Sequence, residues 1–315
     1  TTRFIYFLHF ILIMKKRKQK KSLVVPIFLA VLSVIIVGFI VIPLFSSFIN
    51  YEAENVALIS VEGTITGNGA SYLGSSTISS KDIVRFIESA AENEQIEVIL
   101  IEINSPGGSA VATDEIATAI KRTKKPTVSL IREAGASGGY WVASATDHII
   151  ANKMSITGSI GVLSSYMEFS DLMDKYGISY QRLVAGDKKD VGTPFKKLTE
   201  DEEKYLQGKI NKIHDYFIEE IANNRNLEKS QVEKLATGEI FLGVEALDLG
   251  LIDQLGDKEI AKEYIQETYG LEEVNFLVYQ KEVGLLDVLS QVFTDLSFNL
   301  GKGIGAILLE NNNGL

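Results

Sequence analysis

Beyond residue 51, apolar runs alternate with amphipathic stretches along the chain. Five apolar runs rich in β-branched residues predict buried strands, at residues 56–65, 97–104, 127–131, 148–152 and 180–185. Apolar residues at helical spacing predict one helix from Ser79 or Ser80 to about Asn93, and a second from Ala110 to Thr123. Because strands and helices follow one another in regular succession, the pattern predicts an α/β fold of repeated βαβ units with a mainly parallel sheet.

A longer helix is predicted to follow the last of these strands. Thr199 and Glu202 have the spacing of a capping box, which opens helices, and the helix should run to about Asn224. Its apolar residues recur on one face and are Tyr205, Leu206, Ile210, Ile213, Phe217 and Ile221. We expect this face to pack on the body of the protein.

The first fifty residues have a different pattern. Residues 23–48 carry no charge, and as a helix they would be about 39 Å long, enough to cross a hydrocarbon core of about 30 Å. We therefore predict a transmembrane helix at 22–49, with the basic run KKRKQKK keeping residues 1–21 cytoplasmic. Residues 1–13, upstream of Met14, are expected to come from a misplaced start and are given no function.

Charge and composition narrow the function. The formal charge is −10, and the seven basic residues of the first fifty leave 24 basic and 41 acidic residues in the rest. Such an acidic body would be repelled by nucleic acid, which excludes a nucleic-acid partner. The chain has no cysteine, so a thiolate nucleophile and disulfides are excluded, and no metal or cofactor is implied.

Two glycine-rich turns hold the candidate chemistry. REAGASGGYW (132–141) places Ser137 in a G-x-S-x-G pattern, the sequence of a strained turn that exposes a nucleophile. NSPGGSA (104–110) follows the predicted strand 97–104 and leads into a predicted helix. Glycine turns that lead into helices present free backbone amides. Gly107 or Gly108, together with Gly138, would supply the two donors of an oxyanion hole.

A serine nucleophile also needs a base. His148 begins an apolar strand, which is typical of a structural residue, and His214 lies within the long helix on or beside its apolar face. A triad of Ser137, an aspartate and His214 has the chain order of the α/β-hydrolases, but that fold places its histidine on a loop. Lysine is the other possible base, and Lys188 and Lys189 lie between glycines in VAGDKKDVG (184–192).

Five segments in consistent order resemble the signal peptide peptidase A family: NSPGGS, GASGGYW, ITGSIGV, AGDKKDVGTPFKKLTEDE and GEIFLGVEALDLGLID. That family comprises membrane-anchored Ser–Lys proteases of ClpP/crotonase-type fold, and the resemblance spans residues 54–260. It implies that Ser137 is the nucleophile, Lys189 the general base and Ser159 a serine that orients this lysine. It also implies that Gly107, Gly108 and Gly138 form the oxyanion hole and that the protein is a homo-oligomer, a ring or dome.

The choice of Lys189 over Lys188 has a physical requirement. A lysine base must be neutral, whereas the reference lysine pKa is about 10.4, so the dyad requires an apolar pocket around it. If the segment is extended, neighbouring side chains point to opposite faces, and Asp190 would lie on the side of Lys188. We expect Lys189 to face the cleft.

Together with this resemblance, these observations predict a membrane-anchored serine endopeptidase. The resemblance implies that it degrades cleaved signal peptides and similar apolar peptides. Its peptidase domain would occupy residues 50–280 outside the cytoplasm, followed by an apolar tail at 281–315. Two alternatives remain at this point. One is a crotonase-like acyl-CoA enzyme that uses only the oxyanion hole, and the other is an inactive membrane scaffold.

Overall fold

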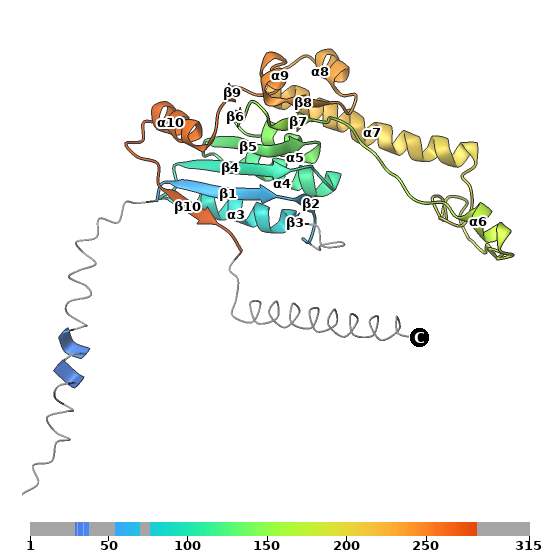
Figure 1. Ribbon diagram of the computed structural model, residues 1–315, viewed down its shortest axis with the longest axis horizontal. Helices are drawn as coiled ribbons and strands as arrows, with labels where there is room; N and C mark the ends of the chain where they lie inside the picture. Colours follow the sequence, from blue (N-terminus) through green and yellow to red (C-terminus); the bar gives the residue numbers. More distant parts are fainter. Residues whose placement is uncertain (1–28, 30, 34, 38–53, 70–75, 282–315) are drawn as a thin grey trace, which may run out of the picture. The chain divides into compact units, whose positions relative to one another are not determined.

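The computed structural model describes residues 29, 31–33, 35–37, 54–69 and 76–281 (Figure 1). The chain divides into two units, Thr1–Glu52 and Ala53–Leu315. The described residues of the first unit are helical, but among described residues no helix is long and apolar enough to cross a membrane. Most of the predicted transmembrane segment 22–49, the start at 1–13 and nearly all of the tail 281–315 lie outside the described residues.

The second unit is built on a mainly parallel sheet, as the sequence predicts. Six strands pair in the order β10-β1-β4-β5-β6-β9, all of them parallel, while β7 pairs parallel with β5 and β8 pairs antiparallel with β7. The strands are β1 (Val56–Glu62), β4 (Val98–Ser105), β5 (Thr127–Ala136), β6 (His148–Ala151), β7 (Ile156–Gly158), β8 (Ile240–Leu242), β9 (Gln254–Leu255) and β10 (Phe276–Tyr279). A separate parallel pair is formed by β2 (Thr64–Thr66) and β3 (Thr77–Ser79).

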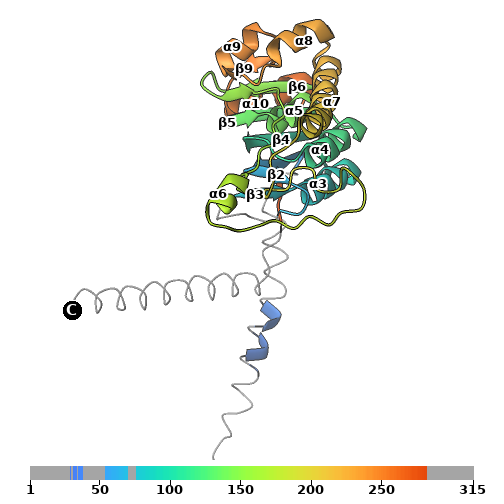
Figure 2. The same cartoon turned by 90° about the vertical axis from the view of Figure 1, so that its right-hand side faces the viewer.

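Helices cover both faces of this sheet. They are α3 (Ser80–Glu92), α4 (Ala110–Arg122), α5 (Gly138–Ser144), α6 (Ser170–Lys175), α7 (Glu200–Arg225), α8 (Lys229–Leu235), α9 (Gly243–Asp248) and α10 (Lys258–Tyr269). In β1, Ala57, Ile59 and Val61 face the core under α3, α4 and α7, whereas Val56 and Leu58 face α10. Figure 2 shows α3, α4 and α7 together on one side of the sheet.

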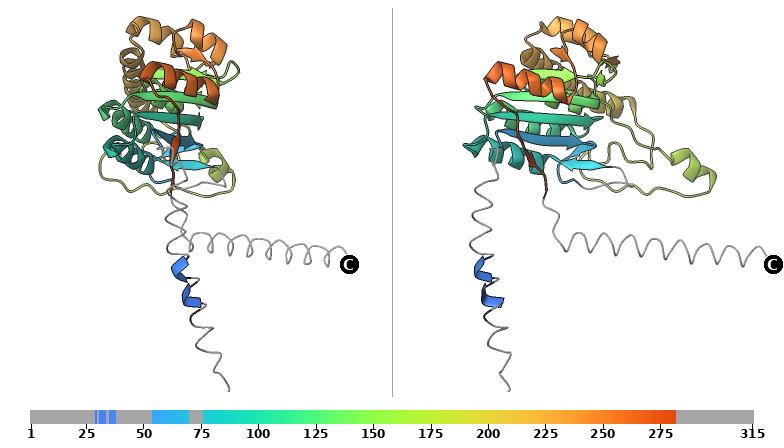
Figure 3. Two further views of the ribbon diagram at one scale, coloured as in Figure 1. Left: turned by 90° about the vertical axis from the view of Figure 1, so that its left-hand side faces the viewer. Right: turned by 60° about the vertical axis from the view of Figure 1, so that its left-hand side comes forward.

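The helix boundaries follow the predicted signals. Ser79 caps α3 by accepting a hydrogen bond from the Asp82 amide. Thr199 and Glu202 form the predicted capping box of α7, and the last helical residue is Arg225. The strand predicted at 180–185 is wrong, because these residues have no strand partner and lie on a segment that extends with α6 away from the sheet (Figures 1 and 3).

Candidate active site

Ser137 occupies a sharp turn between a strand and a helix. β5 ends at Ala136 and α5 begins at Gly138, so the G-x-S-x-G pattern lies in the strand–turn–helix context that a nucleophile turn requires. Ser137 has φ 52° and ψ −121°, a conformation that non-glycine residues rarely adopt. Its amide donates to the Gly158 carbonyl at 2.9 Å, and its carbonyl accepts from the Trp141 amide at 3.0 Å. The surrounding hydrogen bonds therefore maintain a strained backbone, as is common at functional sites.

The bulky residues after Ser137 anchor this turn. Tyr140 is fully buried, its hydroxyl donates to the Leu251 carbonyl at 2.8 Å, and burial raises the pKa of this hydroxyl. Trp141 stacks on Phe217 of α7 with ring centroids 4.8 Å apart. Because both rings are held by the body of the protein, they also fix the backbone of Gly138 and Gly139, which have no side chains to pack.

The two glycine turns meet, because β4 and β5 are neighbours. Ser105 at the end of β4 pairs with Gly135 of β5, which places the turn Pro106–Ser109 beside Ser137. Gly107 has φ 98°, and a Cβ built on it would lie 2.6 Å from the Gly138 nitrogen and 2.9 Å from the Ser137 Cβ. Only glycine fits this approach of one backbone to another.

The backbone amides around Ser137 differ in availability. The Gly107 amide donates to the Ser105 hydroxyl at 3.1 Å, so it is already used. Gly138 is in the first turn of α5, where an amide has no intrahelical acceptor. Gly108 is exposed, and the bridge between Ile65 and this turn uses the Gly107 carbonyl and the Ser109 amide instead. Gly108 and Gly138 are thus the pair suited to bind an oxyanion, while Gly107 shapes the turn.

Ser159 lies directly beside this arrangement. Its neighbour Gly158 pairs with Ala136, and its own amide donates to the Glu239 carbonyl at 2.7 Å. The residue has φ 49° and is half-buried. Five of the six predicted site residues, all except Lys189, therefore line or adjoin one site.

A cavity of about 820 Å³ opens over Ser137. Among its lining residues are Gly107, Gly108, Ser137, Gly138 and Ser159. Its far wall is the face of α7 formed by Gln207, Ile210, Asn211, Ile213, His214 and Phe217. No Asp, Glu, Lys or Arg is among the described residues that line it, and His214 is the one histidine among them.

Lys189 does not line this cavity in the single chain. It is exposed, in a turn in which its amide donates to the Gly186 carbonyl at 3.0 Å. The neighbouring Lys188 ammonium lies 5.7 Å from the Tyr205 ring on α7. Tyr205 precedes Phe217 by twelve residues, about 18 Å along the helix axis. Lys189, next to Lys188, therefore lies on a segment beside the first turns of α7 and not beside Ser137.

The expected alternation of residues 188–190 is wrong, because the segment is a turn and not an extended strand. Asp190 is instead bound by Arg182 at 2.5 and 3.0 Å and lies 3.5 Å from the Lys196 ammonium. The Arg182 hydrogen bonds lower the pKa of Asp190 to about 2. Lys196 in turn binds Glu202 at the start of α7, so this ion-pair network joins the segment to the helix.

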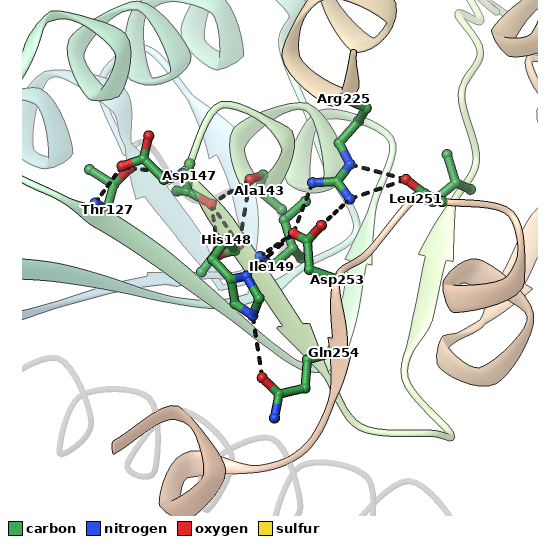
Figure 4. A network of polar contacts seen from close by, with 12 residues as sticks. Thr127, Ala143, Asp147, His148, Ile149, Arg225, Leu251, Asp253 and Gln254 are labelled. Atoms are coloured by element: carbon green, nitrogen blue, oxygen red, sulfur yellow. Dashed lines mark hydrogen bonds and ion pairs between the residues drawn. The ribbon is translucent and has the colours of Figure 1, made fainter. Parts of the chain in front are cut away.

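His148 has the structural position expected of it. Its ring stacks on Tyr264 with centroids 3.8 Å apart, and its Nε2 lies 3.3 Å from the Gln254 side chain (Figure 4). Nearby, Asp253 accepts hydrogen bonds from Arg225 and from the Ile149 amide. Burial opposes ionisation of Asp253, but the hydrogen bonds and charge of Arg225 together with the hydrogen bond from the Ile149 amide outweigh it and lower the pKa of this carboxyl. His148 does not line the cavity over Ser137.

His214, in contrast, lines the same cavity as Ser137. The helical pattern placed it near the apolar face of α7 but gave no sign of this neighbour. Its Nε2 is buried without a hydrogen-bond partner, and no described carboxylate forms an ion pair with it. A histidine base is usually oriented by a third group, so the triad reading lacks its aspartate in the described chain.

Sequence reasoning missed two residues that build this site. Ser105 is fully buried and connects the Gly63 carbonyl to the Gly107 amide. Thr113 lines the cavity beside Gly138. Ser105 directly follows the predicted strand 97–104 and Thr113 lies inside a predicted helix, so neither carried a local signal of its own.

The parallel sheet, the strained serine and the free amides define a serine peptidase of ClpP-like fold. A family model described as ClpP-like SDH-type serine proteinase matches residues 56–174, and one described as Peptidase family S49 matches residues 119–272. "Putative protease MJ0651" of Methanocaldococcus jannaschii is 32% identical over 73% of this chain and 75% of its own length. The chain belongs to peptidase family S49.

Other relatives agree with this family. "Putative signal peptide peptidase SppA" of Enterococcus faecium is 30% identical over 73% of this chain and 68% of its own length. "Protease 4" of Haemophilus influenzae is 31% identical over 66% of this chain but only 34% of its own length. The predicted resemblance to the signal peptide peptidase A family is confirmed, and it favours a peptidase over an acyl-CoA enzyme.

Proposed function

We propose that this protein is a membrane-anchored serine endopeptidase in which Ser137 attacks the peptide carbonyl. The observation that carries the proposal is the strained Ser137 turn, which faces a cavity next to backbone amides that have no other acceptor. The Gly108 and Gly138 amides would hold the negative oxygen of the tetrahedral intermediate, and Gly107 would allow them to approach each other. Oriented donors of this kind typically contribute about 10²–10³-fold to the rate.

We further propose that Lys189 is the general base and that Ser159 orients it. The neutral ammonia-like form of this lysine would take the Ser137 hydroxyl proton as the serine oxygen bonds to the carbonyl carbon. It would then return the proton to the leaving amine as the peptide bond breaks. Water would hydrolyse the acyl-enzyme by the same path, with Lys189 taking a proton from water and giving it to Ser137.

Because the single chain keeps Lys189 away from Ser137, we propose that Lys189 enters the cavity of a second copy of the chain. Two observations support this. The segment that carries it exposes many large apolar side chains, among them Leu163 (86%), Met167 (74%), Tyr176 (70%) and Leu183 (98%). The cavity has no lysine among its described lining residues. Burial of this segment against a neighbour would remove apolar surface from water and assemble the dyad.

The proposed substrates are cleaved signal peptides and similar apolar peptides, and the proposed setting is the cell membrane. The relative named as a signal peptide peptidase supports the first proposal. The uncharged segment 23–48 after a basic run supports an N-terminal anchor with a cytoplasmic start and an extracytoplasmic domain. Protease added to wall-free cells should digest the chain beyond Tyr51, and protection of this region until lysis would contradict the placement.

A fluorophosphonate probe tests the nucleophile. It reacts with activated serines, so it should label the wild-type protein and not Ser137→Ala. Labelling of Ser137→Ala at the wild-type rate would overturn the assignment of Ser137. Absence of labelling and of peptide cleavage in the folded wild-type protein would instead indicate a protein that kept the fold without the activity.

Mixing two inactive variants tests the origin of the lysine. Ser137→Ala supplies Lys189, and Lys189→Ala supplies Ser137, so co-assembly should restore activity if the dyad forms between copies. A dyad within one chain predicts no recovery, because each protomer then lacks one member. Mixing Ser137→Ala with a Ser137→Ala, Lys189→Ala double variant is the control and should remain inactive under either arrangement.

A further inference from the structure

Three residues of the cavity wall hold buried polar atoms without hydrogen-bond partners. These atoms are Thr113 Oγ1, Trp141 Nε1 and His214 Nε2. Thr113 is fully buried, and Trp141 is 6% exposed. Within the described part of the chain, the other such side-chain atom is Glu102 Oε2, which lies 3.2 Å from the Lys258 ammonium. Apart from Glu102 Oε2, the buried side-chain atoms of the described chain that lack a hydrogen-bond partner therefore all belong to residues of one cavity.

The three side chains line the cavity from three helices: Thr113 from α4, Trp141 from α5 and His214 from α7. A Cβ built on Gly138 would lie 2.5 Å from Thr113 Oγ1, so this hydroxyl lies against the proposed oxyanion glycine. Trp141 follows within the same short helix and stacks on Phe217. His214 is three residues before Phe217, and residues at this spacing share one face of a helix. The three residues thus extend from the proposed oxyanion glycine to α7.

The chemistry of these atoms limits what can satisfy them. The indole N–H of Trp141 only donates, whereas the Thr113 hydroxyl and a neutral imidazole nitrogen have a choice of roles. An aliphatic substrate side chain would leave all three atoms unpaired, which is unfavourable for buried polar groups. A charged side chain would find no Asp, Glu, Lys or Arg among the described lining residues of the same chain, and the Lys189 proposed to enter from a second copy acts in its neutral form. A hydroxyl or carboxamide both accepts and donates, without charge.

We infer that this cavity selects a substrate side chain with a neutral hydrogen-bonding group, such as that of Ser, Thr, Asn or Gln. Thr113, Trp141 and His214 would be the residues that recognise it. All three atoms are covered in the structure, so recognition requires these side chains to move and expose them to the substrate. This inference rests on the proposed peptidase function and adds a polar requirement to substrates that are otherwise apolar.

Matched peptides test the inference on the full-length assembled protein. Pairs of peptides carry Thr or Val, which have nearly the same shape, at each of the three residues before the cleaved bond. At one position kcat/KM should favour Thr by about tenfold, the value of about one net hydrogen bond. Thr113→Val should reduce this preference to about threefold, and Thr113→Val with Trp141→Phe to less than about twofold.

The control is Thr118→Val, on the same helix but outside the cavity lining, which should keep the wild-type preference. If Thr113→Val does not fold, as judged by its thermal transition, Trp141→Phe provides the same comparison.

Three outcomes would overturn the inference. Wild-type protein that cleaves both peptides of every pair equally would show that an ordered water fills the recess instead. A Thr preference that survives both substitutions would assign recognition to other residues. If the wild-type protein cleaves no peptide and the fluorophosphonate does not label Ser137, the proposed function falls and this inference falls with it.

Discussion

Replacement of Gly107 by alanine tests whether the contact between the two glycine turns controls catalysis. The new Cβ would lie 2.6 Å from the Gly138 nitrogen, about 0.8 Å inside an ordinary contact, which begins near 3.4 Å. Because the atoms in the way are backbone, the turn must move by a similar distance. Misplacement of catalytic groups by about 1 Å costs about 10²-fold, so kcat should fall about a hundredfold. KM should change less than kcat, since Gly107 is one of many residues that line the cavity and most of the lining is not altered.

The same substitution also strains the backbone, because φ at Gly107 is 98°. We expect a loss of about 2 kcal/mol in the free energy of unfolding, which lowers Tm by about 4–8 °C. Gly270→Ala is the matched control, because φ there is 72° and no heavy atom lies within 4 Å of the new Cβ. It should lower Tm comparably and leave kcat unchanged. Gly107→Ala with kcat within about threefold of wild type would refute the proposed role of this contact.

Three further predictions concern other parts of the molecule. Lys189→Arg should be inactive at every pH, because a guanidinium stays protonated, while Lys188→Ala should keep most peptidase activity; the reverse pattern would identify Lys188 as the base. Ser159→Ala should lie between wild type and Lys189→Ala in kcat/KM, because it misplaces the base without removing it. Asp253→Asn should lower Tm at pH 7 by about 2–6 °C, about 1–2 kcal/mol for a partly screened ion pair with Arg225. The fold lowers the pKa of Asp253, so the ionised carboxyl stabilises the folded protein above the pKa it has in the unfolded chain. This stabilisation is lost as pH falls through the folded pKa. The Tm values of the wild type and Asp253→Asn should therefore converge in acid.

The sheet could be predicted because its central strands are buried on both faces. Such strands are continuous apolar runs, and those of β1, β4, β5 and β6 are visible in the sequence. The short strands β7, β8 and β9 have two or three residues each, too few to show a periodic pattern. They form because residues distant in sequence meet beside β5 and β6, which no local pattern encodes.

At residues 180–185, in contrast, the sequence predicted a strand that the structure does not contain. The composition of these residues favours a strand, but a strand also needs a neighbour with which to pair, and this segment extends away from the sheet (Figure 3). Local preference for β-structure depends strongly on such tertiary context. In the proposed assembly, a second copy of the chain would supply contacts for this segment.

The turn at Ser137 was predictable for a reason that did not apply to the position of Lys189. Ser137 and its glycines lie in short turns between predicted strands and helices, so the local motif marks them, although Gly158 and Phe217 complete their geometry. Lys189 lies on a segment whose contacts in the single chain are ion pairs with the end of α7 and not with Ser137. The family resemblance implies Lys189 as the base. The sequence does not show whether Lys189 acts on Ser137 of its own chain or of a second copy.

This division between a fixed nucleophile and a remote base has a kinetic consequence. Ser137 is held by the sheet and by buried aromatic rings, so its geometry should not depend on assembly. If Lys189 comes from a neighbour, the fraction of complete dyads equals the fraction of assembled interfaces and falls on dilution. Specific activity of the detergent-solubilised protein should therefore decrease with concentration, in parallel with the oligomer fraction measured by light scattering. Chemical cross-linking before dilution should prevent the decrease. Constant specific activity in a sample shown to be monomeric would mean that Lys189 folds back onto Ser137 of its own chain.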